Sequence, residues 1–161
     1  MAKIIYVGEN GCHLDSLFSM LRERGHQVAV SMWDYSIALQ DLGVKPVFPD
    51  GHKVTPPGPP YDMIILEMLG MPVGLEYMPT GLLESASVWN PGLVLLRLLR
   101  QGNIPELAWA KNIPVFVTDA SACCIPVHDV LKVSPQATFF PKFDDQGWVP
   151  QIQSILCGGE S

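Results

Sequence analysis

The sequence predicts an α/β fold built on one doubly wound, five-stranded parallel sheet. Apolar runs rich in β-branched residues alternate with stretches of helical periodicity along most of the 161 residues. One of these runs, residues 63–66, has no polar interruption, which is typical of a strand buried on both faces. Because strands and helices alternate, parallel strands joined by right-handed crossovers are expected. A hydrophobic content of 48% is enough for one substantial core, so we expect a single domain over residues 1–161.

The first part of the chain supplies two strands and two helices. A strand is expected over residues 3–7, which are mainly apolar and β-branched. Leucine and phenylalanine then recur at helical spacing over residues 14–21, and Gly25 can end that helix. A second strand follows over residues 27–31, and a short helix over about residues 34–42.

Two irregular insertions interrupt the alternation. Residues 43–60 contain six prolines and three glycines, and proline lacks the backbone donor that helices and sheet interiors need. A second insertion, at about residues 73–89, is apolar enough to need a surface to cover. We expect it either to form a lid over the end of the central strand or to pack on the surface away from it.

The second half is expected to hold a helix, two strands and a closing helix. Asn90 and Pro91 are typical of a helix start, and Gly102 is typical of a helix end. The residues between are nearly all apolar, which leaves only Arg97 and Arg100 to face water. The remaining elements are strands at residues 113–117 and 137–140 and a last helix that begins at Pro150.

Composition argues against several classes of function. The net charge of −6 disfavours a surface that binds nucleic acid, which would need clustered basic residues. No apolar run reaches the roughly 18 residues needed to span a bilayer, and no signal peptide is recognisable. We therefore expect a cytoplasmic protein without membrane contact, whose four cysteines are reduced and structural.

The central strand places a carboxylate at the end of the predicted sheet. Glu67 directly follows the apolar run of residues 63–66. In open α/β sheets, functional groups gather at the carboxyl ends of the strands. Glu67 is therefore the first candidate for a functional residue.

Several strings resemble response-regulator receiver domains, whose fold is called CheY-like or flavodoxin-like. Residues 21–28 are similar to the exit of the family's first helix, and residues 112–117 resemble its fourth strand. Asp62 precedes Glu67 by five residues, as the family's strand-opening aspartate precedes its phosphoaccepting aspartate. Residues 140–142 resemble the end of the fifth strand. The resemblance covers most of the chain outside the two insertions, and it implies a (βα)5 three-layer sandwich.

The resemblance assigns a role to the positions that follow the first and central strands. Receivers hold Mg²⁺ with two acids after the first strand; the matching positions here are Gly8 and Glu9, with Asn10 beside them. Glu67 replaces the phosphoaccepting aspartate. Loss of an acidic ligand weakens a Mg²⁺ site, and the extra methylene of glutamate misplaces the acceptor for in-line transfer.

The other two site positions follow the fourth and fifth strands. An ungapped match puts Asp119 at the family's hydroxyl position, and Thr118 serves instead if the strand end shifts by one residue. The family's lysine is matched by Lys142, although the proline that usually follows it is replaced by Phe143. Glu67 is then expected either to be solvated at the sheet edge or to form an ion pair with Lys142 that resembles the activated state.

These departures imply a degenerate receiver, or pseudo-receiver, that is not an enzyme and works in signal transduction by binding protein. No cofactor is expected, although weak Mg²⁺ binding stays compatible with the remaining acids. The expected partner is a signalling protein or a second copy of this chain. Phe143 and Trp148 either form an aromatic anchor for that partner or pack on the core. The alternative is a small flavodoxin-like ligand-binding protein or enzyme that uses the crevice at the carboxyl ends of the strands.

Overall fold

The fold is built on one sheet of five parallel strands. The computed structural model describes residues 1–8, 14–32, 34–45, 52–68, 91–119, 127–141 and 145–157. The strands lie in the order β2-β1-β3-β4-β5, and all four neighbouring pairs are parallel. Their bounds are β1 (Lys3–Gly8), β2 (Gln27–Met32), β3 (Met63–Glu67), β4 (Val115–Asp119) and β5 (Thr138–Pro141). The predicted doubly wound parallel sheet is confirmed.

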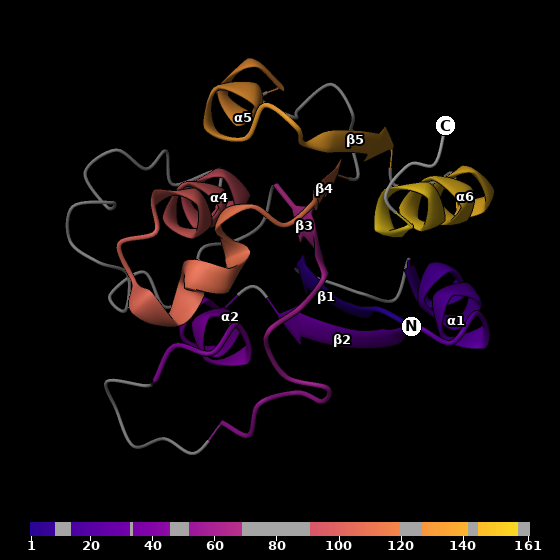
Figure 1. Cartoon of the computed structure of the whole chain (residues 1–161), viewed down its shortest axis with the longest axis horizontal. Coiled ribbons are helices and arrows are strands. Elements are labelled where there is room, and N and C mark those ends of the chain that lie inside the picture. The colour runs from indigo at the N-terminus through magenta and orange to yellow at the C-terminus, as the bar shows by residue number, and fades with distance from the viewer. Residues whose placement is uncertain are drawn as a thin grey trace.

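Helices cover both faces of the sheet, which makes a three-layer sandwich (Figure 1). On one face, α1 (Asp15–Glu23) packs beside α6 (Asp145–Leu156). The other face carries α2 (Tyr35–Asp41), α4 (Pro91–Gln101) and α5 (Val127–Val133), with the 3₁₀ helix η3 (Pro105–Lys111) against α4. No helix in the described ranges is long and apolar enough to cross a membrane.

Alternating side chains divide the core into two parts, one on each face of the sheet. Along β1, Ile4 and Tyr6 belong to the core beneath α1 and α6, whereas Ile5 and Val7 belong to the core beneath α2 and α4. All five residues of β3 are buried, as expected for a central strand covered on both faces. The site at the end of β3 therefore rests on a fully packed strand.

Two elements begin several residues away from, or later than, the positions that the sequence predicts: the fourth strand and the last helix. The fourth strand begins at Val115 rather than at residue 113, because Pro114 has no N–H and only its carbonyl joins the ladder, accepting from Ile64 at 3.1 Å. The last helix begins at Asp145 and carries Pro150 in its interior. Burial of the apolar residues in its early turns outweighs the one hydrogen bond that Pro150 cannot make. Two further helices, η3 and α5, have no counterpart among the predicted elements.

Arg100 is half-buried and bonded to neighbouring segments, which corrects the prediction that it faces water. Its guanidinium turns toward the backbone carbonyls of Ala110 and Lys111 in η3, at 2.7 and 3.0 Å. It also donates to the carbonyl of Ile113 at 2.8 Å and to Oγ of Ser134 at 3.1 and 3.2 Å. Burial lowers the pKa of Arg100. The N–H donors of the Arg100 guanidinium thus find their acceptors in carbonyl and hydroxyl oxygens of neighbouring segments.

The described part of the 43–60 insertion is anchored to the end of α2. Asp41 has 0% of its surface exposed and accepts hydrogen bonds from Nε2 of His52 and from the N–H of Thr55, both at 2.8 Å. The hydroxyl of Tyr61 donates to the backbone carbonyl of Asp41 at 3.2 Å. A buried carboxylate needs such donors, since an unpaired one would be costly. The segment that leads into β3 is therefore fixed by polar contacts as well as by packing.

Other predictions fall on residues that the structure does not describe. The lid prediction for residues 73–89 stays a prediction for this reason. So does the structural role of Cys12, Cys123 and Cys124. Cys157 is described, and it is a free, exposed thiol rather than a core residue.

Candidate functional site

Glu67 ends β3 at the carboxyl edge of the sheet, and its side chain is buried. Only 3% of its surface is exposed, and Oε2 accepts a hydrogen bond of 2.7 Å from the hydroxyl of Tyr6. Tyr6 lies on β1 with 0% exposed, and its ring packs against that of Phe18 in α1 with 5.3 Å between centroids. The expectation of a solvated carboxylate is wrong, because so small an exposed surface leaves little contact with water. Lys142 lies outside the described residues, so its ion pair with Glu67 stays a prediction.

The strand register explains why these side chains meet. Tyr6 pairs with Ile65 and Val7 pairs with Leu66, so β1 and β3 reach the carboxyl edge together. Side chains alternate between faces along a strand. Tyr6 and Glu67 are each on the face covered by α1 and α6, on neighbouring strands, and the tyrosine side chain is long enough to reach the glutamate.

Gly8 provides the space that this contact needs. A Cβ atom added at Gly8 would collide with the hydroxyl of Tyr6 and with Oε2 of Glu67. The tyrosine hydroxyl and the glutamate carboxylate thus occupy the volume into which a side chain at Gly8 would project. Glycine is required here because the side chains of Tyr6 and Glu67 approach its Cα closely, and not because of its backbone angles.

Thr118 is the residue that β4 brings to the site. It is the register partner of Glu67, whereas Asp119 pairs with Pro141 of β5. The Thr118 side chain is fully buried, and within the described ranges its Oγ1 has no hydrogen-bond partner. Of the two candidates for the hydroxyl position, Thr118 is the one in register with Glu67.

The described residues do not fit a magnesium ion of the receiver type. Such a site needs several oxygen ligands in octahedral arrangement, and the first acidic position is Gly8, with the space above it filled by Tyr6. Across the described stretches, no cluster of three or more His, Cys, Asp and Glu side chains could hold a metal ion. Glu9 and Asn10 lie outside the described residues.

The roles of two residues at this site, Tyr6 and Gly92, could not be predicted from the sequence. Tyr6 reads as one more apolar strand residue, and only its position two residues before a glycine in the same strand hints at a close contact. Gly92, in the first turn of α4, donates its N–H to the carbonyl of Met68 at 3.1 Å. Both roles depend on the neighbour across the fold, which local sequence does not specify.

Trp148 does not offer an exposed aromatic anchor, which corrects that expectation. It has 0% of its surface exposed and packs against Phe116 of β4, with ring centroids 5.5 Å apart. Its position in α6 faces the sheet, where a large aromatic ring gains most from burial. Phe143 lies outside the described residues.

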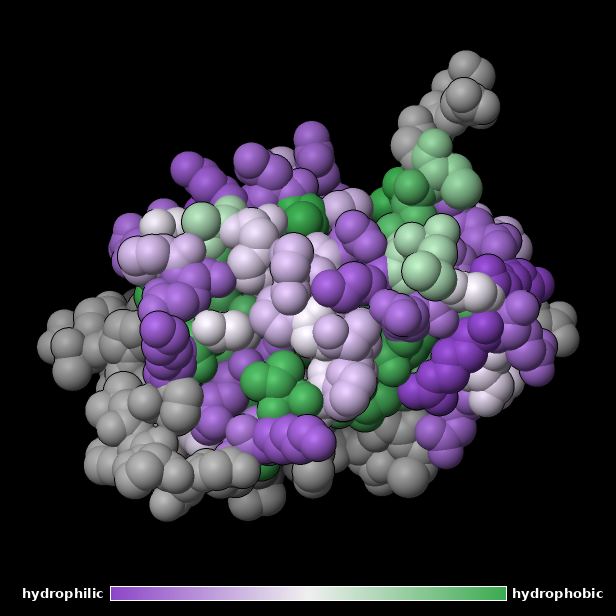
Figure 2. Space-filling model, turned by 60° about the horizontal axis from the view of Figure 1, so that its bottom comes forward, coloured by the Kyte–Doolittle hydropathy of each residue, from purple (hydrophilic) through white to green (hydrophobic). Residues whose placement is uncertain are grey.

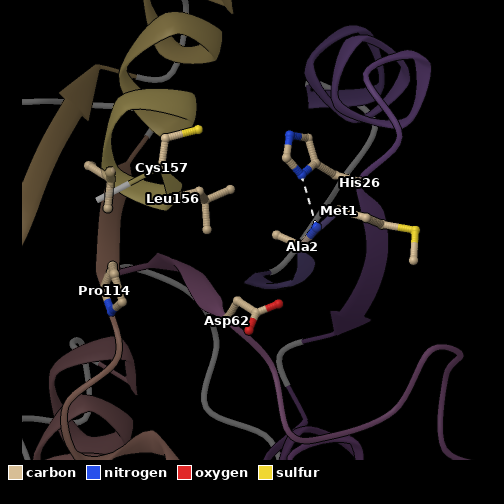
Figure 3. Close-up of a pocket in the computed structure, with 8 residues that line it drawn as sticks. Met1, Ala2, His26, Asp62, Pro114, Leu156 and Cys157 are labelled. Atoms are coloured by element: carbon tan, nitrogen blue, oxygen red, sulfur yellow. Dashed lines mark hydrogen bonds between the residues drawn. The ribbon is translucent and has the colours of Figure 1, made fainter. Parts of the chain in front are cut away.

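A pocket of about 430 Å³ lies at the opposite edge of the sheet (Figure 3). Its walls come from the segments before the strands and from the last turn of α6, with Asp62, His26 and Cys157 around it. Asp62 accepts from the N–H of Lys3 at 2.7 Å and so caps the start of β1. Burial, with the positive amino terminus and Arg24 nearby, lowers the pKa of His26. This pocket is not the carboxyl-edge crevice that a flavodoxin-like ligand binder would use.

The chain is similar to solved receiver structures over nearly its whole length. No family model matches the sequence, and no curated protein matches it. A two-component response regulator from Clostridium difficile has a TM-score of 0.64 and 14% identity, with 100% of each chain covered. A putative response regulator from Chloroflexus aurantiacus has a TM-score of 0.62 and 16% identity, covering 97% of this chain and 98% of that one.

A third similar structure is the receiver domain of a sensor histidine kinase from Pseudomonas aeruginosa, described with a magnesium ion coordinated in its active-site cleft. Its TM-score is 0.58 at 15% identity, and 98% of each chain is covered. At such identities the likeness concerns the fold. The strand order, the two helical layers and these comparisons together show that this chain has the fold of a response-regulator receiver domain.

Proposed function

We propose that this protein is a receiver-like signalling domain that does not accept a phosphoryl group and acts by binding another protein. The observation that carries the proposal is the buried contact between Tyr6 and Glu67 over Gly8. It lies at the carboxyl edge of the sheet, where open α/β folds keep their functional groups. The signalling role is supported by the similar structures, which are receivers of two-component systems.

The geometry of this contact supports a loss of phosphotransfer. An attacking carboxylate oxygen must be reached in line by the phosphoryl donor. With 3% of its surface exposed and Oε2 bonded to the Tyr6 hydroxyl, Glu67 offers little surface to a donor. An acid at the Gly8 position would have no room while Tyr6 keeps its place.

The test is incubation with acetyl phosphate, or with beryllofluoride, in the presence of Mg²⁺. We expect no gain of a phosphoryl group in the intact mass and no change in melting temperature. A receiver with an intact acidic pair and aspartate, treated in parallel, is the positive control. A saturable, Mg²⁺-dependent adduct on Glu67 would refute the loss of phosphotransfer.

Exposed apolar residues on α5 support a partner surface there. Val127 and Leu131 are 42% and 39% exposed, and residues four apart share one side of a helix. Exposed apolar side chains that lie together are a common feature of interfaces. Figure 2 shows the molecule from another side. On that face, polar and weakly polar residues cover most of the described surface, and hydrophobic residues show between them in separate areas.

Replacement of Val127 and Leu131 by serine tests this surface. The double variant should lose self-association in sedimentation velocity, or capture of a signalling partner, at unchanged melting temperature. Val54→Ser is the matched control, since Val54 is 38% exposed on a different segment. If both variants bind as the wild type does, α5 is not the interface.

A further inference from the structure

The pocket at the amino edge of the sheet is built from segments that hydrogen bonds hold in place. Residues just before β1, β3 and β4 line it together with the last turn of α6 (Figure 3). Lys3 and Asp62 bind each other twice: the N–H of Lys3 donates to Oδ2 of Asp62, and the N–H of Asp62 donates to the carbonyl of Lys3, both at 2.7 Å. The volume of about 430 Å³ lies within the range of about 300–1,000 Å³ in which proteins bind small molecules.

Asp62 gives this pocket a negative charge. It is the one acidic side chain among the eight described residues that line the pocket. Its Oδ2 is bonded to the N–H of Lys3, whereas Oδ1 has no partner among the described residues. An ammonium group suits this oxygen, because a charged donor and a charged acceptor form a strong hydrogen bond. Since Asp62 is exposed, water screens such a pair and keeps its contribution modest.

His26 supplies a hydrogen-bond donor to the same pocket, across from the last turn of α6 (Figure 3). Its Nδ1 accepts from the N–H of Ala2 at 3.3 Å, so the proton of the neutral ring is on Nε2. Burial, the positive amino terminus and Arg24 lower the pKa of His26, which keeps the ring neutral at pH 7. The same two positive charges favour an anionic group beside Nε2. The pocket thus offers groups of opposite preference, Asp62 for a cation and His26 for an anion.

Most of the remaining lining is apolar. Ile155 and Leu156 come from α6, and Pro114 precedes β4. All three are partly exposed. An apolar ligand group that covered them would remove hydrocarbon surface from water, which is favourable. The pocket is therefore suited to a molecule that carries both charges and an apolar side chain.

We propose that this pocket binds a small zwitterion with an apolar side chain, which is the chemistry of an apolar α-amino acid. The ammonium group pairs with Oδ1 of Asp62, and the carboxylate accepts from Nε2 of His26. The apolar side chain lies on Ile155 and Leu156. This site goes beyond the proposed function, because it lies at the edge of the sheet opposite to Glu67 and involves no phosphoryl group.

The experiment is a titration of the full chain with L-phenylalanine, followed by backbone amide shifts in NMR spectra. We expect saturable shifts at Ala2, Asp62 and Cys157, and none at Glu67. Phenethylamine lacks the carboxylate, and 3-phenylpropionate lacks the ammonium group. Each should bind about threefold to fivefold more weakly, the effect of an ion pair that is open to water. Glycine, which lacks the apolar side chain, should give no saturable shift.

Asp62→Asn tests the anionic group. The amide oxygen of asparagine can still accept from the N–H of Lys3, so the variant removes the charge and keeps the start of β1. L-phenylalanine and phenethylamine should each bind about threefold to fivefold more weakly, and 3-phenylpropionate should not weaken. Asp129→Asn is the matched control, since Asp129 is an exposed acid on α5 and does not line the pocket. It should leave all three affinities unchanged.

Cys157 provides a second, independent measurement. Its free, exposed thiol lines the pocket. Saturating L-phenylalanine should slow its alkylation by iodoacetamide, read from the mass of the peptide that contains Cys157. Cys157→Trp should fill part of the pocket and abolish the saturable shifts at Ala2 and Asp62. This variant decides the case if Asp62→Asn does not fold.

Three results would overturn the site. The first is a set of shifts that grow with L-phenylalanine without saturating. The second is equal affinity for phenethylamine, 3-phenylpropionate and L-phenylalanine, since the pocket would then not recognise a zwitterion. The third is binding that survives Cys157→Trp. Phosphorylation of Glu67 is measured separately, so failure of this site and failure of the proposed function give different results.

Discussion

The hydroxyl of Tyr6 donates a hydrogen bond to a carboxylate oxygen of Glu67, 61 residues away in the sequence. Both side chains are buried, so the bond replaces the water that each group would have in the unfolded chain. Gly8 leaves the space for it, and the register of β1 against β3 brings the two residues together. This one contact closes the position that an acidic metal ligand would need.

Tyr6→Phe should lower the free energy of unfolding by about 1.5–3 kcal/mol, the range for a hydrogen bond to a charged group. Urea denaturation measures the change. Tyr61→Phe makes the same chemical change at a hydroxyl that donates to a neutral carbonyl at 3.2 Å. It should cost only about 0.5–1.5 kcal/mol. Equal losses would contradict a stronger hydrogen bond at Tyr6 than at Tyr61.

Gly8→Ala should cost about 1–3 kcal/mol of stability, because the new methyl group overpacks the space between Tyr6 and Glu67. It should also change the carboxyl chemical shift of Glu67. Gly25→Ala is the control: Gly25 has a φ of 83° with no atom within 4 Å of an added Cβ. That variant should lose about 1 kcal/mol through backbone strain alone. An unchanged Glu67 signal in Gly8→Ala would contradict the close approach.

Arg100→Lys should lower stability by about 2–3 kcal/mol, although the charge is conserved. Lysine carries three donors on one nitrogen and cannot reach acceptors in η3, before β4 and after α5 at once. Arg22→Lys, which loses one bond of 3.2 Å to a carbonyl, should cost about 0.5–1 kcal/mol. Similar urea midpoints for the two variants would argue that Arg100 faces solvent, as the sequence alone suggests.

Stability should fall at alkaline pH, in part through Tyr61. Burial, with the negative charge of Asp41, raises the pKa of Tyr61 above its ordinary value of 10.0. The folded state therefore favours the neutral phenol. This stabilisation is fully present below pH 10.0 and is lost as the pH rises through the folded-state pKa.

Urea midpoints on both sides of pH 10.0 test this, with Tyr61→Phe as the comparison. The wild type should lose more stability on alkalinisation than the variant does. Tyr35, whose pKa burial also raises, is present in both proteins and cancels in the difference. Parallel pH profiles would mean that Tyr61 titrates in the folded state as it does in the unfolded chain.

The sequence by itself determined the five strands, their parallel direction and the position of Glu67 at the end of the central one. The apolar run of β3 identifies a strand buried on both faces, and the first polar residue after it must appear at the sheet edge. Strand and helix periodicities are local properties of the sequence. They can be recognised without knowing which other segments of the fold pack against the element. The largest boundary shifts lie next to Pro114 and Pro150, residues whose effect depends on their surroundings.

Only the tertiary structure decided what each buried residue contacts. It paired Tyr6 with Glu67, placed Thr118 in register with Glu67 and buried Trp148 against Phe116. It also turned a charged helix residue, which sequence assigns to water, toward the carbonyls of η3. The physical reason is that apolar pattern fixes which side of an element is buried, whereas strand register and helix packing, set by segments far apart in the chain, fix the partner.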